Sequence, residues 1–172
     1  LPSLIAWPVG GLLAAAAVSA HSRQRWDLHP TALADRAAAG GAWAVDGFAD
    51  DPTTYLLTGA LYLGERFDAA IDLLDRAVED AGRRGRASSE LSARFTRGAI
   101  RIIGGDLREG LDDLEAAVGL GRLSAAPHHL YAASAGALLV RYSQLVGDSD
   151  RAAAVLAHLD EALAALDLSL TA

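Results

Sequence analysis

Apolar residues recur at spacings of three and four along most of the chain, which is the pattern of helices with one buried face. No run alternates apolar and polar residues with β-branched side chains, so we expect no sheet. Short connections between the runs would make neighbouring helices antiparallel. The predicted helices lie at about 3–19, 30–48, 52–63, 67–84, 88–103, 106–120, 127–146 and 149–167.

Local signals mark where these helices begin and end. Pro30, Pro52 and Pro127 each open an apolar run, and a proline in the first turn of a helix costs no hydrogen bond. Asp51 and Ser88 stand where capping side chains are expected. Glycines fall between the runs and predict their ends, at positions 64, 85, 104–105, 121 and 147.

The chain repeats itself. The segment from Glu65 to Val78 matches the segment that begins at Gly105, forty residues later, and a weaker third copy begins at Gly147, forty-two residues after the second. A small residue at positions 70, 110 and 152 would let two helices cross closely. Each hairpin alone would leave its apolar stripe exposed, so the copies predict stacked hairpins. The predicted repeat core consists of Phe67, Ala70, Ile71, Leu74, Leu107, Gly110, Leu111, Leu114 and Leu156.

These copies resemble the second helix of tetratricopeptide-like repeats. More narrowly, residues 63–74, 81–85, Arg97 and 105–110 look like the helical-repeat region of large ATP-binding LuxR-family transcriptional regulators. The resemblance is good over about residues 52–120, thinner over 127–167 and weak before residue 50. Two features depart from the family: the forty-residue period exceeds the usual period of about thirty-four, and Gly110 replaces an expected alanine.

The pattern and the resemblance imply an all-α fold, an α-α superhelix (a tetratricopeptide-like solenoid) of about eight antiparallel helices. We expect a single helical-repeat domain, 1–172, with an irregular N-terminal hairpin over 1–50 and repeat hairpins at 52–84, 88–120 and 127–167. The resemblance implies a non-catalytic interaction and signal-sensing module, whose concave groove takes a protein partner or a small inducer. In that family ATP and DNA are bound by other domains, so we expect neither a cofactor nor direct nucleic-acid contact here. The alternative is a free-standing tetratricopeptide-like adaptor that binds partner proteins.

Composition removes several classes of function. The chain has 172 residues, of which 52% are hydrophobic and 22% charged, as is typical of a globular domain. It has no cysteine, so disulfides, thiol catalysis and cysteine-based metal sites are excluded. All 15 basic residues are arginine, which excludes a lysine-containing phosphate-binding loop and Schiff-base chemistry within these residues. The net charge of −7 argues against electrostatic binding of nucleic acid.

The first residues raise the question of targeting. Residues 1–20 are apolar and end in a sequence that imitates a signal-peptidase site. However, the stretch has no basic leader, is interrupted by Pro8 and two glycines, and is too short and broken to span a bilayer comfortably. We therefore expect a buried helix, a cytoplasmic location and no membrane association. Because the sequence contains no methionine, we also expect a piece of a longer protein.

Candidate catalytic and metal-binding residues are few. On a helix His128 and His129 would point about 100° apart and could not share a metal ion well, so we expect no metal site. The acidic residues of 106–115 suit the start of their helix, and nothing in the sequence indicates that any of them is buried. No nucleophile elbow is present. We expect no enzymatic activity; an unrecognised helical enzyme or ligand-binding protein would need a deep pocket with convergent polar side chains.

The arginines form the most suggestive surface feature. Arg94, Arg97 and Arg101 share one helix face, distinct from the apolar face, and Arg141 repeats Arg101 at an offset of forty. One hypothesis is that these arginines line the groove and meet an acidic partner segment or an anionic ligand. The alternative is a solvated face balanced by Glu90 and neighbouring aspartates. An apolar terminal helix could also pair two copies in a homodimer.

Overall fold

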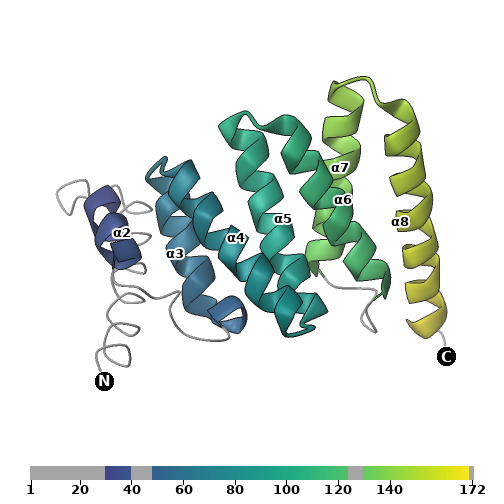
Figure 1. Ribbon diagram of the computed structural model, residues 1–172. Helices are drawn as coiled ribbons and strands as arrows, with labels where there is room; N and C mark the ends of the chain where they lie inside the picture. Colours follow the sequence, from purple (N-terminus) through teal and green to yellow (C-terminus); the bar gives the residue numbers. More distant parts are fainter. Residues whose placement is uncertain (1–29, 40–47, 124–129, 171–172) are drawn as a thin grey trace. The chain divides into compact units, whose positions relative to one another are not determined.

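The structure is a computed structural model that describes residues 30–39, 48–123 and 130–170 (Figure 1). These residues are helical apart from short turns, and they contain no strand, so the predicted all-α class is confirmed for this part of the chain. The helix predicted over 3–19 and the proline expected to open a helix at position 127 lie outside it. Two compact units are present, Leu1–Ser89 and Glu90–Ala172. No helix in the described ranges is long and apolar enough to cross a membrane.

In the first unit, α3 packs against both α2 and α4. The prolines begin their helices as predicted, and Asp51 caps α3 by accepting a hydrogen bond from the Thr53 N–H at 2.7 Å. Of the helix predicted over 30–48, the structure describes Pro30–Ala39 as α2, residues 40–47 lie outside the described ranges, and Phe48 belongs to a 3-10 turn, η3, that precedes α3. The described elements are α2 (Pro30–Ala39), η3 (Phe48–Asp50), α3 (Pro52–Leu63) and α4 (Phe67–Arg83).

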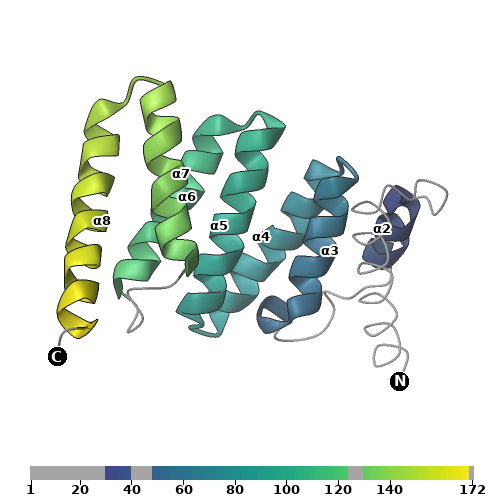
Figure 2. The same cartoon turned by 180° about the vertical axis from the view of Figure 1, so that it is seen from behind.

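In the second unit, α7 contacts both α6 and α8, which Figure 2 shows from behind. The start of α5 belongs to the first unit and the rest of that helix to the second. The helices are α5 (Ala87–Gly104), α6 (Leu107–Leu123), α7 (Leu130–Leu145) and α8 (Ser149–Leu170). Their shared core is the cluster of Leu91, Leu111, Leu114, Ala117, Val118, Ala135, Leu139 and Val155.

The turns within the three hairpins, after α3, α5 and α7, have the same geometry, and the turn after α4 repeats it with Gly85 at a φ of 65° and a 2.9 Å bond from the Arg86 N–H to the Ala81 carbonyl. In each, one residue takes a left-handed backbone and the next N–H donates to a carbonyl five residues earlier, which is the Schellman ending of a helix. The left-handed residues are Glu65, Gly105 and Gly147, with φ of 57°, 104° and 80°. The closing bonds run from Arg66 to Leu61 at 2.9 Å, from Asp106 to Arg101 at 2.8 Å and from Asp148 to Ser143 at 2.8 Å. Equivalent positions are therefore 40 residues apart between the turns after α3 and α5, and 42 apart between those after α5 and α7, as in the sequence repeat.

Several predicted boundaries are wrong, among them the end of α8, which reaches Leu170 and not residue 167. Helix α6 continues past residue 120, so Gly121 lies inside it and not between helices. A Cβ at Gly121 would stand 2.6 Å from the Cβ of Ala132, so this glycine permits close packing of α6 on α7. Ser88 lies in the first turn of α5 and not before it, because the turn after α4 closes at Arg86 and α5 follows at once.

Most predicted repeat-core residues lie in the interior. Leu156 does not: it keeps 43% of its surface exposed, and its neighbour Val155 is buried instead. Leu114, forty-two residues earlier, is fully buried within the cluster that includes α7, whereas Leu156 does not belong to that cluster. The stacking of the hairpins into a solenoid stays a prediction. The buried members are Ala70, Leu74, Gly110, Leu111 and Leu114, and the half-buried ones are Phe67, Ile71 and Leu107.

Candidate functional site

Three of the four predicted arginines converge on one buried carboxylate in the second unit. Arg97 donates to both carboxylate oxygens of Asp113, from Nε at 2.8 Å and from Nη2 at 2.5 Å. Arg101 donates from Nη1 to Oδ2 of Asp113 at 2.7 Å. Arg94 lies 3.7 Å from Asp113 and donates from Nε to Glu90 at 2.8 Å. We call these five residues the arginine–aspartate cluster.

The cluster is largely withdrawn from water. The exposed fraction of the side chain is 4% for Asp113 and 11% for Arg97, and it rises to 21% for Arg101 and 27% for Arg94. Charged groups this far from solvent require partners of opposite charge. The arginine face is therefore only partly open to solvent: Arg97 is nearly covered, whereas Arg94 and Arg101 keep about a quarter of their side chains exposed. Glu90 and an aspartate balance its charge.

Glycines explain why the two helices bring these charges together. A Cβ on Gly98 would stand 2.8 Å from the carbonyl oxygen of Gly110, so α5 and α6 cross with almost no space between their backbones. Asp113 follows Gly110 by about one turn on α6, and Arg97 and Arg101 flank the crossing on α5. The small residue predicted to permit a close crossing at position 110 thus also positions the carboxylate.

The burial of Asp113 contradicts the expectation that no acidic residue of 106–115 is buried. A signal for it was present in the repeat, because Asp113 stands forty residues after Leu73, an apolar core position. Asp80 is a second acidic residue at a position that is apolar in the other copy: it is 2% exposed, and the residue forty positions later is Leu120. Its Oδ1 accepts from Arg84 Nε at 3.0 Å, while Oδ2 has no hydrogen-bond partner in the described part of the chain.

Arg141 does not join the arginine–aspartate cluster. It is exposed on α7, with its guanidinium carbon 6.0 Å from the ring centre of Tyr142. The reason is that the third hairpin is offset from the second by 42 residues, as the closing hydrogen bonds of their turns show. Ser143, and not Arg141, is therefore equivalent to Arg101. The offset of forty that related the two arginines does not apply to the third hairpin.

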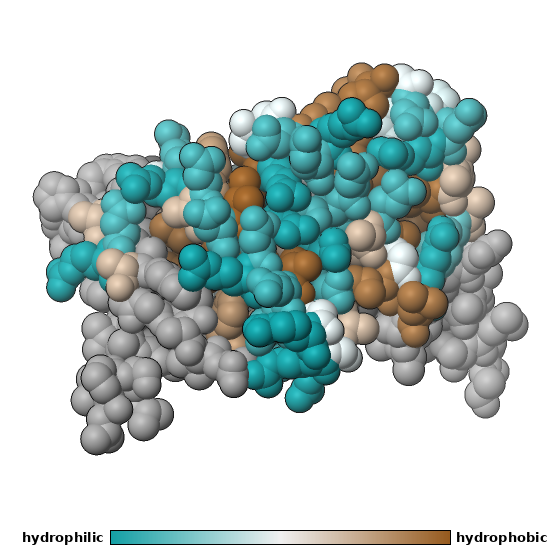
Figure 3. Space-filling view, viewed as in Figure 1, coloured by the Kyte–Doolittle hydropathy of each residue, from teal (hydrophilic) through white to brown (hydrophobic). Residues whose placement is uncertain are grey.

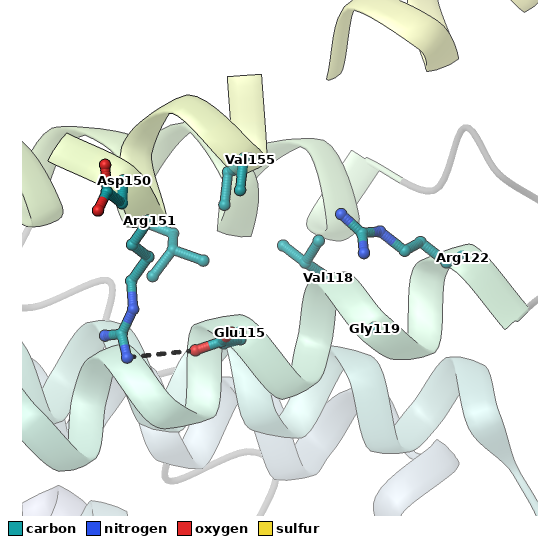
Figure 4. A pocket seen from close by; sticks show the side chains of 9 residues that line it. Glu115, Val118, Gly119, Arg122, Asp150, Arg151 and Val155 are labelled. Atoms are coloured by element: carbon teal, nitrogen blue, oxygen red, sulfur yellow. Dashed lines mark ion pairs between the residues drawn. The ribbon is translucent and has the colours of Figure 1, made fainter. Parts of the chain in front are cut away.

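A pocket of about 450 Å³ lies on α6, α7 and α8 (Figure 4). Val118, Leu139 and Val155 form its floor, and each is at most 6% exposed. At one end Arg151 lies 3.4 Å from Glu115, and Arg122 lies toward the opposite end. The volume suits a small molecule. Because the floor is already covered, however, a ligand would remove little further apolar surface from water, and the sequence pattern had not indicated this pocket.

Metal ligands and apolar surface are the remaining features to consider in the part of the chain that the structure describes. The described residues contain no group of three or more side chains that could hold a metal ion, and His128 and His129 lie outside the described ranges. Figure 3 shows apolar surface at the end of the second unit, where α7 turns into α8 and where Leu145 and Val146 are exposed. Single exposed apolar side chains of this kind are common on soluble proteins.

Comparisons of the chain with models of known families, with curated proteins and with solved structures find no match. The functional argument therefore rests on the repeated hairpins and on the arginine–aspartate cluster.

Proposed function

We propose that the chain is a non-catalytic helical-repeat module for protein interaction and signal sensing within a LuxR-type ATP-dependent transcriptional regulator. The observation that carries the proposal is the recurrence of one hairpin turn at Glu65, Gly105 and Gly147, at the offsets of the sequence repeat. Repeated hairpins present rows of equivalent helix faces, which is how solenoids build extended binding surfaces. The resemblance over about residues 52–120 supports the choice of parent protein.

The partner that this surface suits is an acidic protein segment or an anionic inducer. Arg94 and Arg101 keep about a quarter of their side chains exposed, and Arg141 is exposed. A guanidinium has five N–H donors, so a second acceptor can bind beside Asp113. Arg97, which holds both oxygens of Asp113, is the arginine least suited to a partner, and we assign it a structural role.

The parent protein is the first test. Sequencing the complete open reading frame should reveal Gly-x-x-x-x-Gly-Lys-Ser/Thr on the N-terminal side and a basic helix-turn-helix on the C-terminal side. Such a result would agree with a regulator of this type. A reading frame without either domain would contradict it and would favour the free-standing adaptor.

The binding surface is tested separately, in cells, with the complete protein. A photo-crosslinking amino acid at position 141 should capture a defined partner, identified by mass spectrometry, and Arg94→Ala with Arg101→Ala should abolish the capture. The same crosslinker at position 108, an exposed arginine of α6, is the control. Capture that is equal at both positions, or that survives the alanine substitutions, would rule out recognition by these arginines.

A further inference from the structure

The three similar hairpins differ in chemistry at three equivalent positions. The turn bonds align α3–α4 with α5–α6 at an offset of 40, and α5–α6 with α7–α8 at an offset of 42. In the first and third hairpins all three side chains are at most 6% exposed and none is charged. The sets are Leu57, Leu61 and Leu73, then Arg97, Arg101 and Asp113, then Leu139, Ser143 and Val155.

We call the first set the leucine layer and the second the ion layer. The ion layer is internally matched, because Arg97 and Arg101 on α5 both donate to Asp113 on α6. At the equivalent positions the other two hairpins carry no charged side chain that could pair with it. If α5 packed against a helix equivalent to α4, its two arginines would face a leucine. If α6 packed against a helix equivalent to α3, Asp113 would face two leucines.

Either exchange leaves a charge buried without a counter-charge, which is far more unfavourable than a misfitted apolar contact. The leucine layer imposes no such restriction, because apolar side chains pack with many partners at modest cost. A chain built from similar hairpins needs such discrimination, since its helices share turns, small crossing residues and apolar stripes.

We infer that the ion layer determines helix pairing: it makes α5 select α6 over the equivalent helices of the other hairpins, in the same chain or in a second copy. Buried polar groups that specify register and partner are known in helical assemblies. Stability is not the main contribution, because a buried ion triad can often be replaced by apolar side chains without loss.

The test copies the leucine layer into the second hairpin. The variant Arg97→Leu/Arg101→Leu/Asp113→Leu should keep its helical circular dichroism and unfold at an unchanged or higher urea concentration. It should nevertheless lose the single monomer peak in size-exclusion chromatography with light scattering, and its amide resonances should be duplicated. Wild type should give one monomer peak and one set of resonances.

The control replaces an ion pair of the same unit that lies outside the hairpin crossing. Glu115→Leu/Arg151→Leu removes the 3.4 Å pair between α6 and α8 and should leave one monomeric species. A leucine-layer variant that is equally homogeneous would overturn the inference. If leucine at these sites unfolds the chain, methionine replaces it, because its flexible side chain fills irregular space. Unfolding of both variants would also overturn the inference, since the layer would then supply stability that apolar groups cannot.

Discussion

Hairpins α3–α4 and α5–α6 are two versions of one backbone with different interiors. Helices α4 and α6 both have 17 residues, and the turns that precede them have the same closing hydrogen bond. At equivalent positions the first hairpin buries the leucine layer, and the second carries the ion layer, in which Asp113 is buried and Arg97 and Arg101 are half-buried. The first helices differ, with 12 residues in α3 and 18 in α5. The turn and the length of the second helix are therefore shared by hairpins that are held together by different chemistry.

The two layers should also respond differently to damage. Loss of one leucine leaves a cavity that its neighbours partly fill, so the cost depends on local relaxation. Loss of one member of the ion layer leaves its charged partners, which are buried or half-buried, without a counter-charge, and this is strongly unfavourable. Single substitutions in the two hairpins can therefore distinguish the two kinds of interior.

The largest effect should come from Asp113→Leu. It copies the residue found at the equivalent position of α4, yet it leaves Arg97 and Arg101 without their carboxylate. We expect the free energy of unfolding to fall by about 3–5 kcal/mol, measured by urea denaturation. Asp112→Leu, at an exposed neighbouring position, should change it by less than about 0.5 kcal/mol. A loss below about 1 kcal/mol for Asp113→Leu would mean that the ion layer is not tightly paired.

The apolar cores of the two hairpins should behave alike. Leu74 and Leu114 are equivalent and both are fully buried, so each leucine-to-alanine change should cost about 2–5 kcal/mol in urea unfolding. Leu156→Ala should cost less than about 1 kcal/mol, because that side chain is already partly in water. An equal cost at Leu156 would indicate that another surface covers it.

The next effect on stability concerns the place where the two helices of a hairpin cross. A Cβ on Gly110 would stand 2.6 Å from Cγ1 of Ile102, whereas α4 accommodates Ala70 at the equivalent position. Gly110→Ala should therefore destabilise the fold by about 1–3 kcal/mol through overpacking. Gly119→Ala, where the added Cβ meets nothing within 4 Å, should instead stabilise by about 0.5–1 kcal/mol through helix propensity. Thermal unfolding of both variants gives the comparison, and equal signs would contradict it.

The smallest effect concerns the shared turn. Glu65 has a φ of 57°, in a place where the other two hairpins have Gly105 and Gly147. Glu65→Gly should raise stability by about 0.5–1 kcal/mol, because glycine adopts a left-handed backbone without steric cost. Gly105→Ala is the reverse change; no atom lies near its Cβ, so only backbone strain should lower its melting temperature. A Glu65→Gly variant less stable than wild type would show that the Glu65 side chain contributes more than its backbone costs.

Much of the described fold could be predicted from local signals. The bounds of α3 agree with the pattern at both ends, and those of α4 and α5 agree within one residue at each end, since a capping aspartate, prolines and turn glycines act within a few positions. The sequence also placed three arginines together on one face. It did not reveal that Asp113 binds them, because an acidic run at the start of a helix is expected to be solvated. Arg141 was misassigned because the third hairpin has a different offset.

The helices, the turn that closes each hairpin and the spacing of 40 and 42 residues between hairpins follow from local sequence. Each depends on side chains that act within about one helical turn of their own backbone. The crossing of α5 and α6 at Gly98 and Gly110, which buries Asp113 between Arg97 and Arg101, is evident only in the folded molecule. Those charges lie 12 and 16 residues apart in the chain, so their pairing depends on which helix faces meet, and helical periodicity alone leaves that choice open.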